Sequence, residues 1–242
     1  MSRSFALRVL ASHPRAGLMS GIASGITSGL TAAVLFFAAA PSAHAQFAPA
    51  APGTQVHDPS ALKPPPGARV AIVEFEDLEC PDCARANPLL KEASEKYNIP
   101  WVRHDFPLPF HPWSMQAAVN ARWFDTKSKK LGDDYRDAVF ANQPSFAEDP
   151  NRMRQFTEKF AADHKLALPF AIDPMGKLQS EVKTDYALGQ RIGIEHTPTI
   201  WIVTANSKGA PFVEVVDRSK LYQLIDQALV DTKAADTRIS HK

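Results

Sequence analysis

The sequence feature that most constrains the fold is an apolar run from Val70 to Phe75, which leads within a few residues to the pair Cys80 and Cys83. The run has the length and composition of a buried strand. Beyond Cys83, apolar residues recur at helical spacing, at Leu89, Leu90, Ala93 and Tyr97. The pattern therefore predicts a strand-to-helix junction with Cys80 at the N-terminus of the helix.

The predicted position of the two cysteines favours thiol chemistry. Backbone N–H groups and the helix dipole at a helix N-terminus stabilise a thiolate, which is the reactive form of cysteine. Cys80 and Cys83 fall within one helical turn, close enough to form a disulfide. Because the chain has only two cysteines, any internal disulfide must join these two.

These residues and two proline motifs resemble the thioredoxin superfamily. Cys-x-x-Cys on a strand–helix unit is the redox motif of that family, Pro88 resembles its helix-kinking proline, and Thr197-Pro198-Thr199 resembles its cis-proline loop. The ten residues that end at Cys83 (Glu-Phe-Glu-Asp-Leu-Glu-Cys-Pro-Asp-Cys) are most similar to the DsbA-like branch of secreted dithiol oxidases. The resemblance covers about residues 56–232. It implies an α/β, thioredoxin-like fold with an inserted helical subdomain.

Composition and this resemblance together predict how the chain is divided. Apolar stripes at helical spacing fill the region after the second predicted strand, and aspartates and prolines separate them. We expect a signal peptide at 1–45, an Ala/Pro-rich linker and arm outside the core at 46–67, a thioredoxin-like domain at 68–110 and 192–232, the helical insertion at 111–191, and a polar tail at 233–242.

The N-terminal segment has the features of a secretory signal. Three arginines precede an uncharged apolar run from Leu30 to Ala40, and Ala43-His44-Ala45 matches the small-x-small cleavage pattern, which predicts cleavage before Gln46. An uncleaved anchor is the alternative, but the apolar run is short for a membrane span. Export would place the thiols in an oxidising compartment such as the periplasm, where a disulfide persists.

Charge and cysteine usage exclude several classes of partner. Removal of the signal leaves 24 basic and 26 acidic residues, so nothing indicates nucleic-acid binding. His104 and His111 could suggest a metal site together with the two cysteines, but the gap between these histidines is not a usual zinc spacing. We therefore expect no metal and no cofactor.

Glu74 interrupts the first predicted strand, where it shares a face with Val70 and Ile72. A carboxylate inside an apolar strand is costly unless it has a partner or a task. The DsbA-like resemblance implies a catalytic task, which is to move a proton for Cys83. Burial should then raise the pKa of Glu74. The alternatives are a side chain that reaches water from the strand end, and a charge pair with His104.

The resemblance also implies a substrate site and a reaction. The backbone of Thr197, before a cis Pro198, would pair with an extended polypeptide as an added strand does. Cys80, the exposed member of the pair, would exchange disulfides with unfolded or reduced exported proteins. A membrane partner of the DsbB or vitamin-K-epoxide-reductase type would then restore the Cys80–Cys83 disulfide.

The two residues between the cysteines, Pro81 and Asp82, should tune the redox potential. Strongly oxidising members of the resembled family have histidine where this chain has Asp82, and Glu76, Asp77 and Glu79 add negative charge nearby. Because negative charge disfavours a thiolate, Cys80 should be less acidic than in those members and the protein a weaker oxidant. Two alternatives remain open: a reductase or isomerase that a membrane donor keeps reduced, and a non-catalytic module whose disulfide is structural.

Overall fold

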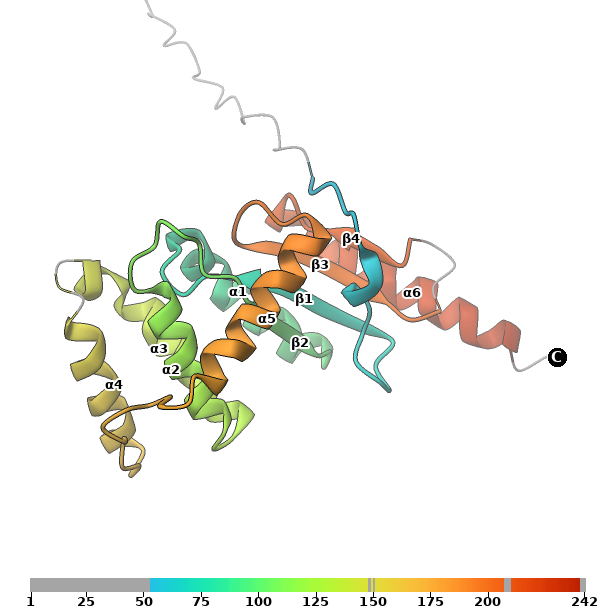
Figure 1. Cartoon of the computed structure of the whole chain (residues 1–242). Helices are drawn as coiled ribbons and strands as arrows, with labels where there is room; N and C mark the ends of the chain where they lie inside the picture. Colours follow the sequence, from blue (N-terminus) through green and yellow to red (C-terminus); the bar gives the residue numbers. More distant parts are fainter. Residues whose placement is uncertain (1–52, 148, 150, 207–209, 240–242) are drawn as a thin grey trace, which may run out of the picture. The chain divides into compact units, whose positions relative to one another are not determined.

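The computed structural model describes residues 53–147, 149, 151–206 and 210–239 (Figure 1). The expected signal peptide at 1–45, its cleavage site before Gln46 and the first part of the expected linker lie outside the described residues. Within the described ranges, no helix has both the length and the apolar character that a membrane span requires.

A four-stranded mixed sheet in the order β2-β1-β3-β4 lies at the centre. β1 (Val70–Glu76) pairs in parallel with β2 (Trp101–Asp105) and antiparallel with β3 (Thr199–Thr204), which pairs antiparallel with β4 (Phe212–Glu214). Every residue of β1 is buried, which explains its almost continuous apolar sequence. The strand expected at Val70–Phe75 is confirmed, and it extends one residue further, to Glu76.

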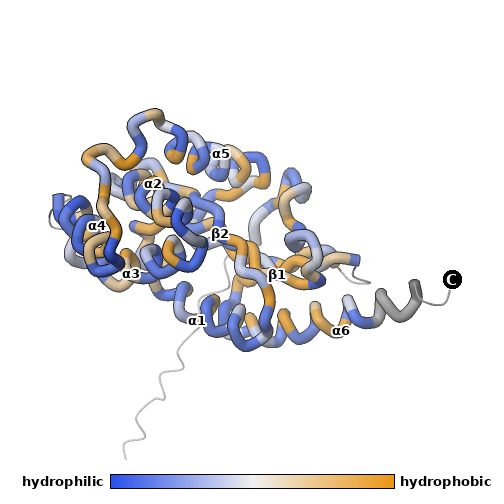
Figure 2. The backbone as a smooth tube through the Cα atoms, turned by 90° about the horizontal axis from the view of Figure 1, so that it is seen from below, coloured by the Kyte–Doolittle hydropathy of each residue, from blue (hydrophilic) through white to orange (hydrophobic). Residues whose placement is uncertain are grey.

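Helices cover both faces of the sheet (Figure 1). α1 (Pro81–Tyr97) and α6 (Leu221–Ile239) pack on the face that holds Val70 and Ile72, and the short helix η2 (Arg218–Lys220) leads directly into α6. α5 (Lys177–Ile192) and the short helix η1 (Pro59–Ala61) pack on the opposite face. In Figure 2, β1 is hydrophobic over most of its length, as a strand covered on both faces must be.

The helical insertion is built on a separate, aromatic core. α2 (Ser114–Asp125), α3 (Lys129–Ala147) and α4 (Asn151–Asp163) enclose it. Its buried rings are those of Trp113, Trp123, Phe124, Tyr135, Phe140, Phe146 and Phe160. Cys80 and Cys83 belong to this cluster although α1 also packs on the sheet, so the dithiol lies where the two cores meet. The thioredoxin-like fold with a helical insertion is confirmed.

α5 belongs to both cores. Leu178 near its start packs with the aromatic cluster, whereas Tyr186 and Ile192 pack against the sheet. The helix ends at Gly193, whose φ of 103° is the left-handed conformation expected of a C-terminal cap. The domain boundary expected at residue 191 therefore does not coincide with a break in packing.

One expectation about the ends of the chain needs correction. The arm before residue 68 is not outside the core, because Leu62 is 3% exposed and packs with the α5 face of the sheet. The Thr54 amide also donates to the Glu214 carboxylate over 2.6 Å. At the other end, the backbone of α6 stays helical to Ile239, beyond the expected start of a polar tail at residue 233.

Candidate active site

The strand-to-helix junction places both cysteines in the first turn of α1. Cys80 is the N-cap residue and has extended backbone angles, and Pro81 occupies the first helical position. Proline is well suited to that position, since its fixed φ is helical and its missing N–H would have no partner there. Cys80 and Cys83 are both free thiols, so this structure represents the dithiol form.

Cys80 occupies an environment that favours its ionised form. The hydrogen bond from the Cys83 thiol, a hydrogen bond with Thr197 and the backbone N–H groups of Asp82 and Cys83 together lower the pKa of Cys80 to about 5, against the effect of burial. Its thiol lies 3.3 Å from the Thr197 carbonyl oxygen. A thiol with this pKa is mostly thiolate at neutral pH, which makes it both a nucleophile and a good leaving group.

Cys83 has the opposite tendency, although it lies only one turn away. Burial, the hydrogen bond with Cys80 and the charge of Glu74 raise the pKa of Cys83 well above the ordinary value of 9.0. Its side chain is fully buried, whereas Cys80 is 7% exposed. The expectation that Cys80 is an exposed residue is therefore corrected: it is the more accessible of the two, but neighbouring residues cover most of it.

The Thr197–Pro198 loop lies against Cys80, as expected from the sequence, and its peptide bond is cis. It immediately precedes β3, which pairs with β1, and this pairing brings residues 117 positions apart into contact. Beside the loop is a groove of about 350 Å³. Its lining combines charged and apolar side chains: Asp82, His196, Thr197, Pro198, Ile200, Val215, Val216 and Arg218.

Glu74 lies inside the protein, with 1% of its surface exposed. Burial, with the charge of Glu76, raises the pKa of Glu74 to about 8, and Arg103 and a hydrogen bond from Trp101 act in the opposite direction. The expectation of a raised pKa is confirmed, and a side chain that reaches water is excluded. The suggested pairing with His104 is wrong, because His104 Nδ1 lies 3.0 Å from Asp185 Oδ1.

The acidic residues before Cys80 are individually bound. Arg103 donates to Glu76 over 2.7 Å, and Arg136 lies 3.4 Å from the same carboxylate. Asp77 accepts from Leu108 N–H over 2.7 Å and contacts His111 and Ser114. Glu79 accepts from Trp113 N–H over 2.8 Å. Each of these carboxylates therefore accepts hydrogen bonds within the protein, and Glu76 is also paired with two arginines, which weakens the argument from local negative charge.

Asp82 is paired as well. Its Oδ1 accepts from Arg218 over 2.7 Å and from Arg85 over 3.0 Å. Burial raises the pKa of Asp82, but the hydrogen bond and charge of Arg218, with the charge of Arg85, lower it overall. Sequence reasoning missed Arg218, since no local pattern shows that η2 returns to the start of α1.

Trp101 and Arg103 are further site residues that the sequence analysis did not identify. They alternate on β2, which places them on the same face of the sheet as Glu74. A charged residue that alternates with a tryptophan inside an expected strand was the available signal. As for metals, no cluster of three or more His, Cys, Asp or Glu side chains that could hold an ion occurs among the described residues.

The comparisons with known proteins agree with this geometry. The family model described as Thioredoxin matches residues 65–218. The crystal structure of α-DsbA1 from Wolbachia pipientis has a TM-score of 0.56 at 16% identity and covers 73% of this chain and 92% of its own. Reduced DsbA1 from Neisseria meningitidis has a TM-score of 0.50 at 16% identity, with 72% and 92% covered. ScsC from Proteus mirabilis has a TM-score of 0.50 at 21% identity, with 69% and 71% covered.

A dithiol at a strand–helix junction beside a cis-proline loop defines the class of thioredoxin-fold dithiol proteins. The family model covers well over half of the sequence, and the chain belongs to the thioredoxin family. Its fold is that of the DsbA structures, including the helical insertion. No curated protein matches the sequence.

Proposed function

We propose that this chain is an exported thiol:disulfide oxidoreductase that introduces disulfides into reduced secreted or envelope proteins. The observation that carries the proposal is the opposite behaviour of the two thiols. The pKa of Cys80 is lowered to about 5 and that of Cys83 is raised, and the Cys80 sulfur lies beside the cis-proline groove. A disulfide that serves only as a structural crosslink needs neither this asymmetry nor a groove.

The reaction starts from the Cys80–Cys83 disulfide. A client thiolate attacks the Cys80 sulfur, the bond to Cys83 breaks, and a mixed disulfide forms between the client and Cys80. A second client thiolate then attacks the client sulfur of that bond, and Cys80 leaves as a stabilised thiolate. The client loses two electrons and the protein gains them as a dithiol.

Glu74 supplies the proton that the first step requires. Cys83 leaves as a thiolate in a buried site where the charged form is disfavoured. The pKa of Glu74 is about 8, so at neutral pH this carboxyl holds a proton that it can pass to the Cys83 sulfur. The same group takes the proton back when the disulfide is restored.

The groove beside Pro198 would hold the client. Ile200, Val215 and Val216 offer apolar surface, whereas Asp82 and Arg218 form an ion pair within the lining. The backbone of Thr197 would pair with an extended client segment, which requires little sequence specificity. This arrangement suits unfolded polypeptides.

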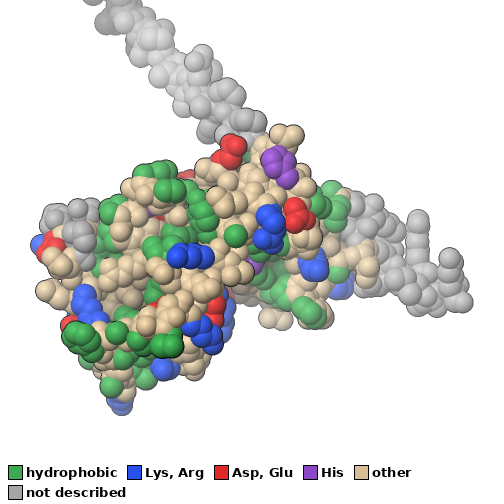
Figure 3. Space-filling view, in the orientation of Figure 1, with side chains coloured by type: hydrophobic (Ala, Val, Ile, Leu, Met, Phe, Trp, Pro, Cys, Tyr) green, Lys and Arg blue, Asp and Glu red, His purple; other side chains and the backbone are tan. Residues whose placement is uncertain are grey.

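On the face shown in Figure 3, basic and acidic side chains are interspersed, so that face has no single-sign patch of the kind that nucleic acids bind.

A membrane partner of the DsbB or vitamin-K-epoxide-reductase type would remove the two electrons and restore the disulfide. Such a partner would meet Cys80 through the same groove, because Cys83 is fully buried. Its chemistry is that of a quinone-linked oxidant, and the periplasm is the expected compartment.

Trapping of mixed disulfides tests the proposal. In a Cys83→Ala variant the client cannot be released by attack from Cys83, so incubation with a partly oxidised client should leave covalent adducts on Cys80. A Cys80→Ala variant, which keeps the buried thiol alone, is the matched control and should form none. If the Cys83→Ala variant forms no adducts that dithiothreitol releases, the disulfide is structural and the proposal is wrong.

The alternative function is that of a reductase or isomerase kept reduced by a membrane donor. The pKa of about 5 for Cys80 lies between the thiol pKa values of about 3.5 for a strongly oxidising DsbA and about 7 for thioredoxin. This intermediate value supports the expectation of a weaker oxidant. Equilibration with glutathione measures the potential, and a value near about −120 mV, that of the strongest oxidants, would contradict it.

A further inference from the structure

The Glu74 carboxylate has one direct hydrogen-bond donor among the described residues, the indole of Trp101. Nε1 of Trp101 donates to Oε2 of Glu74 over 3.0 Å. In the parallel register Ile72 lies opposite Trp101 and Glu74 lies opposite Arg103, so Trp101 is the diagonal neighbour of Glu74 on one face of the sheet. A diagonal neighbour is within reach of an aromatic side chain.

Arg103 is the nearest cation, but its hydrogen bonds go elsewhere. Its guanidinium donates to Glu76 over 2.7 and 3.1 Å and to Asn87 over 3.1 Å. It also stacks over the Trp101 ring, with its central carbon 4.3 Å from the ring centroid. Arg103 therefore acts on Glu74 through its charge and through the ring that it holds in place, and the indole makes the direct contact.

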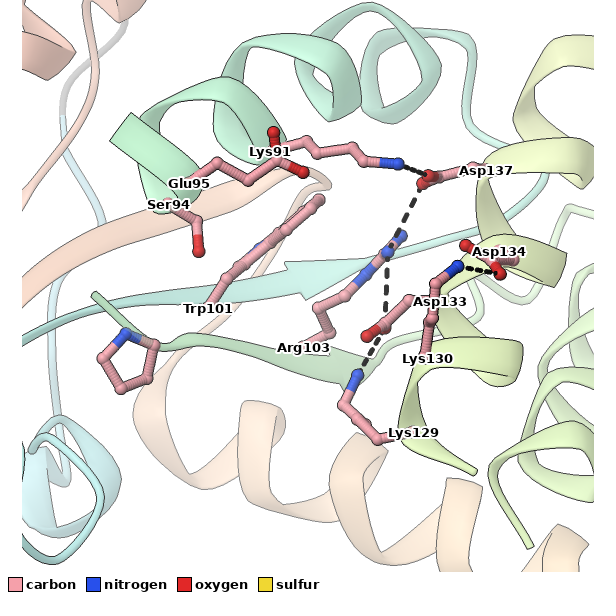
Figure 4. A pocket seen from close by; sticks show the side chains of 11 residues that line it. Lys91, Ser94, Glu95, Trp101, Arg103, Lys129, Lys130, Asp133, Asp134 and Asp137 are labelled. Carbon is pink, nitrogen blue, oxygen red and sulfur yellow. Dashed lines mark hydrogen bonds and ion pairs between the residues drawn. The ribbon is translucent and has the colours of Figure 1, made fainter. Parts of the chain in front are cut away.

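Trp101 also lines a cleft of about 510 Å³ between α1, β2 and α3 (Figure 4). Lys91 of α1 reaches Asp137 of α3 across this cleft, with 2.6 Å between the charged atoms. Figure 4 shows the Trp101 ring standing between β2 and α1. Glu74 is not part of the lining, so the indole lies between the buried acid and an opening to solvent.

Several charged or titratable groups lie beside Glu74 or beside its charged neighbours Glu76 and Arg103. They come from β1, β2, α1 and α3: Glu76, Arg103, Cys80, Cys83, Asp133, Arg136 and Asp137. Loss of the Trp101 side chain would remove one hydrogen bond from Glu74, admit water and take away the ring that Arg103 stacks on, whereas a substitution that keeps a ring there tests the hydrogen bond by itself.

We propose that Trp101 is a positioning residue for proton transfer by Glu74: its N–H orients the carboxylate, and its ring keeps the water of the cleft away from it. This inference rests on the proposed function, since it assigns Trp101 a role in the step that protonates Cys83. It goes beyond that function because it links the ionisation of Glu74 to the cleft between α1, β2 and α3, which shares no lining residue with the client groove.

Two substitutions separate the N–H from the ring. Trp101→Phe removes the donor and keeps an aromatic ring in place, so the ionised carboxylate loses a stabilising contact and its pKa should rise by about one unit. Trp101→Ala opens Glu74 to the cleft, so water should stabilise the ionised form and the pKa should fall from about 8 toward the ordinary value of 4.5. A purely structural role gives no reason for opposite signs.

The titration of the Glu74 carboxyl can be followed directly by NMR on protein labelled with ¹³C at glutamate side chains. Glu74→Gln identifies the resonance, and Trp123→Phe is the control for a tryptophan that contacts Lys127 rather than an acid. The proposal is supported if the pKa of Glu74 shifts in opposite directions in the two Trp101 variants. The pH dependence of the rate at which a thiol cleaves the Cys80–Cys83 disulfide, and so releases Cys83, should shift in the same directions. If the pKa of Glu74 in Trp101→Phe equals that of the parent, the proposal is wrong. This result decides the question even if Trp101→Ala does not fold.

The same experiment distinguishes this proposal from the proposed function. The carboxyl titration needs no client, so it is readable even in a protein that exchanges no disulfides. If the titration moves in both variants but the pH profile of Cys83 release does not, Glu74 is not the proton donor and the positioning role is overturned. Absence of client adducts on Cys80 contradicts the oxidoreductase function and leaves the titration result intact.

Discussion

The two sides of the dithiol differ more than their separation in the chain would suggest. Cys80 lies against the cis-proline loop, beside the groove that Thr197 and Pro198 line, and backbone N–H groups at the start of α1 stabilise its charge. Cys83, one turn later, points into the protein toward Glu74 and the aromatic core of the insertion. One helical turn at the meeting of two cores is thus enough to divide the pair into a nucleophile and a protonated partner.

Two carboxyls near the dithiol, Asp82 on the side of Cys80 and Glu74 on the side of Cys83, also differ in their charge states. Asp82 is partly exposed and bound to Arg218 and Arg85, so it stays ionised at neutral pH. Glu74 is buried and its pKa rises to about 8, so it stays mostly protonated. The two carboxyls therefore hold opposite charge states at neutral pH, because burial keeps the proton on Glu74 whereas Arg218 and Arg85 keep Asp82 ionised.

The largest expected effect is the separation of the two thiol titrations. Thiolate absorbance near 240 nm in the reduced protein should show one step at a pH of about 5, from Cys80, and no second step below about 9. In Cys83→Ala the step should move upward, because the hydrogen bond from Cys83 is the main cause of the low pKa. The oxidised protein is the control and should show no step. A first step near pH 9 in the reduced protein would show that the pKa of Cys80 is not lowered and that the two thiols do not differ as described.

Glu74 should make stability depend on pH. Its pKa is 4.5 in an unfolded chain and about 8 in the folded state, so the folded state binds the proton more tightly. The free energy of unfolding should fall by about 1.4 kcal/mol per pH unit as the pH rises from 4.5 to 8. Denaturant titrations of the oxidised protein exclude thiol ionisation, and the difference in slope between the parent and Glu74→Gln gives the contribution of Glu74.

Glu74→Gln should remove that slope and make the oxidised protein more stable at pH 8 than the parent. Glu214→Gln is a control, since that carboxylate accepts hydrogen bonds from Thr54 at a site that is only partly buried. An equal pH slope in the parent and in Glu74→Gln would show that Glu74 is not the buried acid responsible.

The smallest effect is expected at Asp82. Arg218→Met removes a partner and leaves a less compensated carboxylate beside Cys80, so the Cys80 pKa should rise by a few tenths of a unit. Lys220→Met, in the same short helix, removes an equal charge without a hydrogen bond to Asp82 and serves as the control. The redox potential against glutathione should fall with Arg218→Met only, and equal changes in both variants would exclude a specific role for the pair.

Much of the molecule follows from local pattern. The run at Val70–Phe75, the Cys-x-x-Cys pair and Thr197–Pro198 together indicated the fold and the reactive pair, because strand length, helix capping and proline geometry are properties of short segments. Glu74 was also identifiable, since an acid inside an apolar strand is visible in the sequence. The helical stripes of the insertion correctly indicated its helices but not that α5 would join both cores.

Tertiary structure decided the electrostatics. The acidic residues on both sides of Cys80 indicated an exposed negative field, but Arg103 and Arg136 come from β2 and α3 to bind Glu76. Arg218 comes from η2 to bind Asp82. The small remaining exposure of Cys80 and the contact between Trp101 and Glu74 depend in the same way on which strands become neighbours. The sequence by itself determined which groups are candidates for the reaction, because chemical identity and local conformation are properties of short segments. Only the fold decided their charge states, since a pKa depends on burial and on neighbours that are remote along the chain.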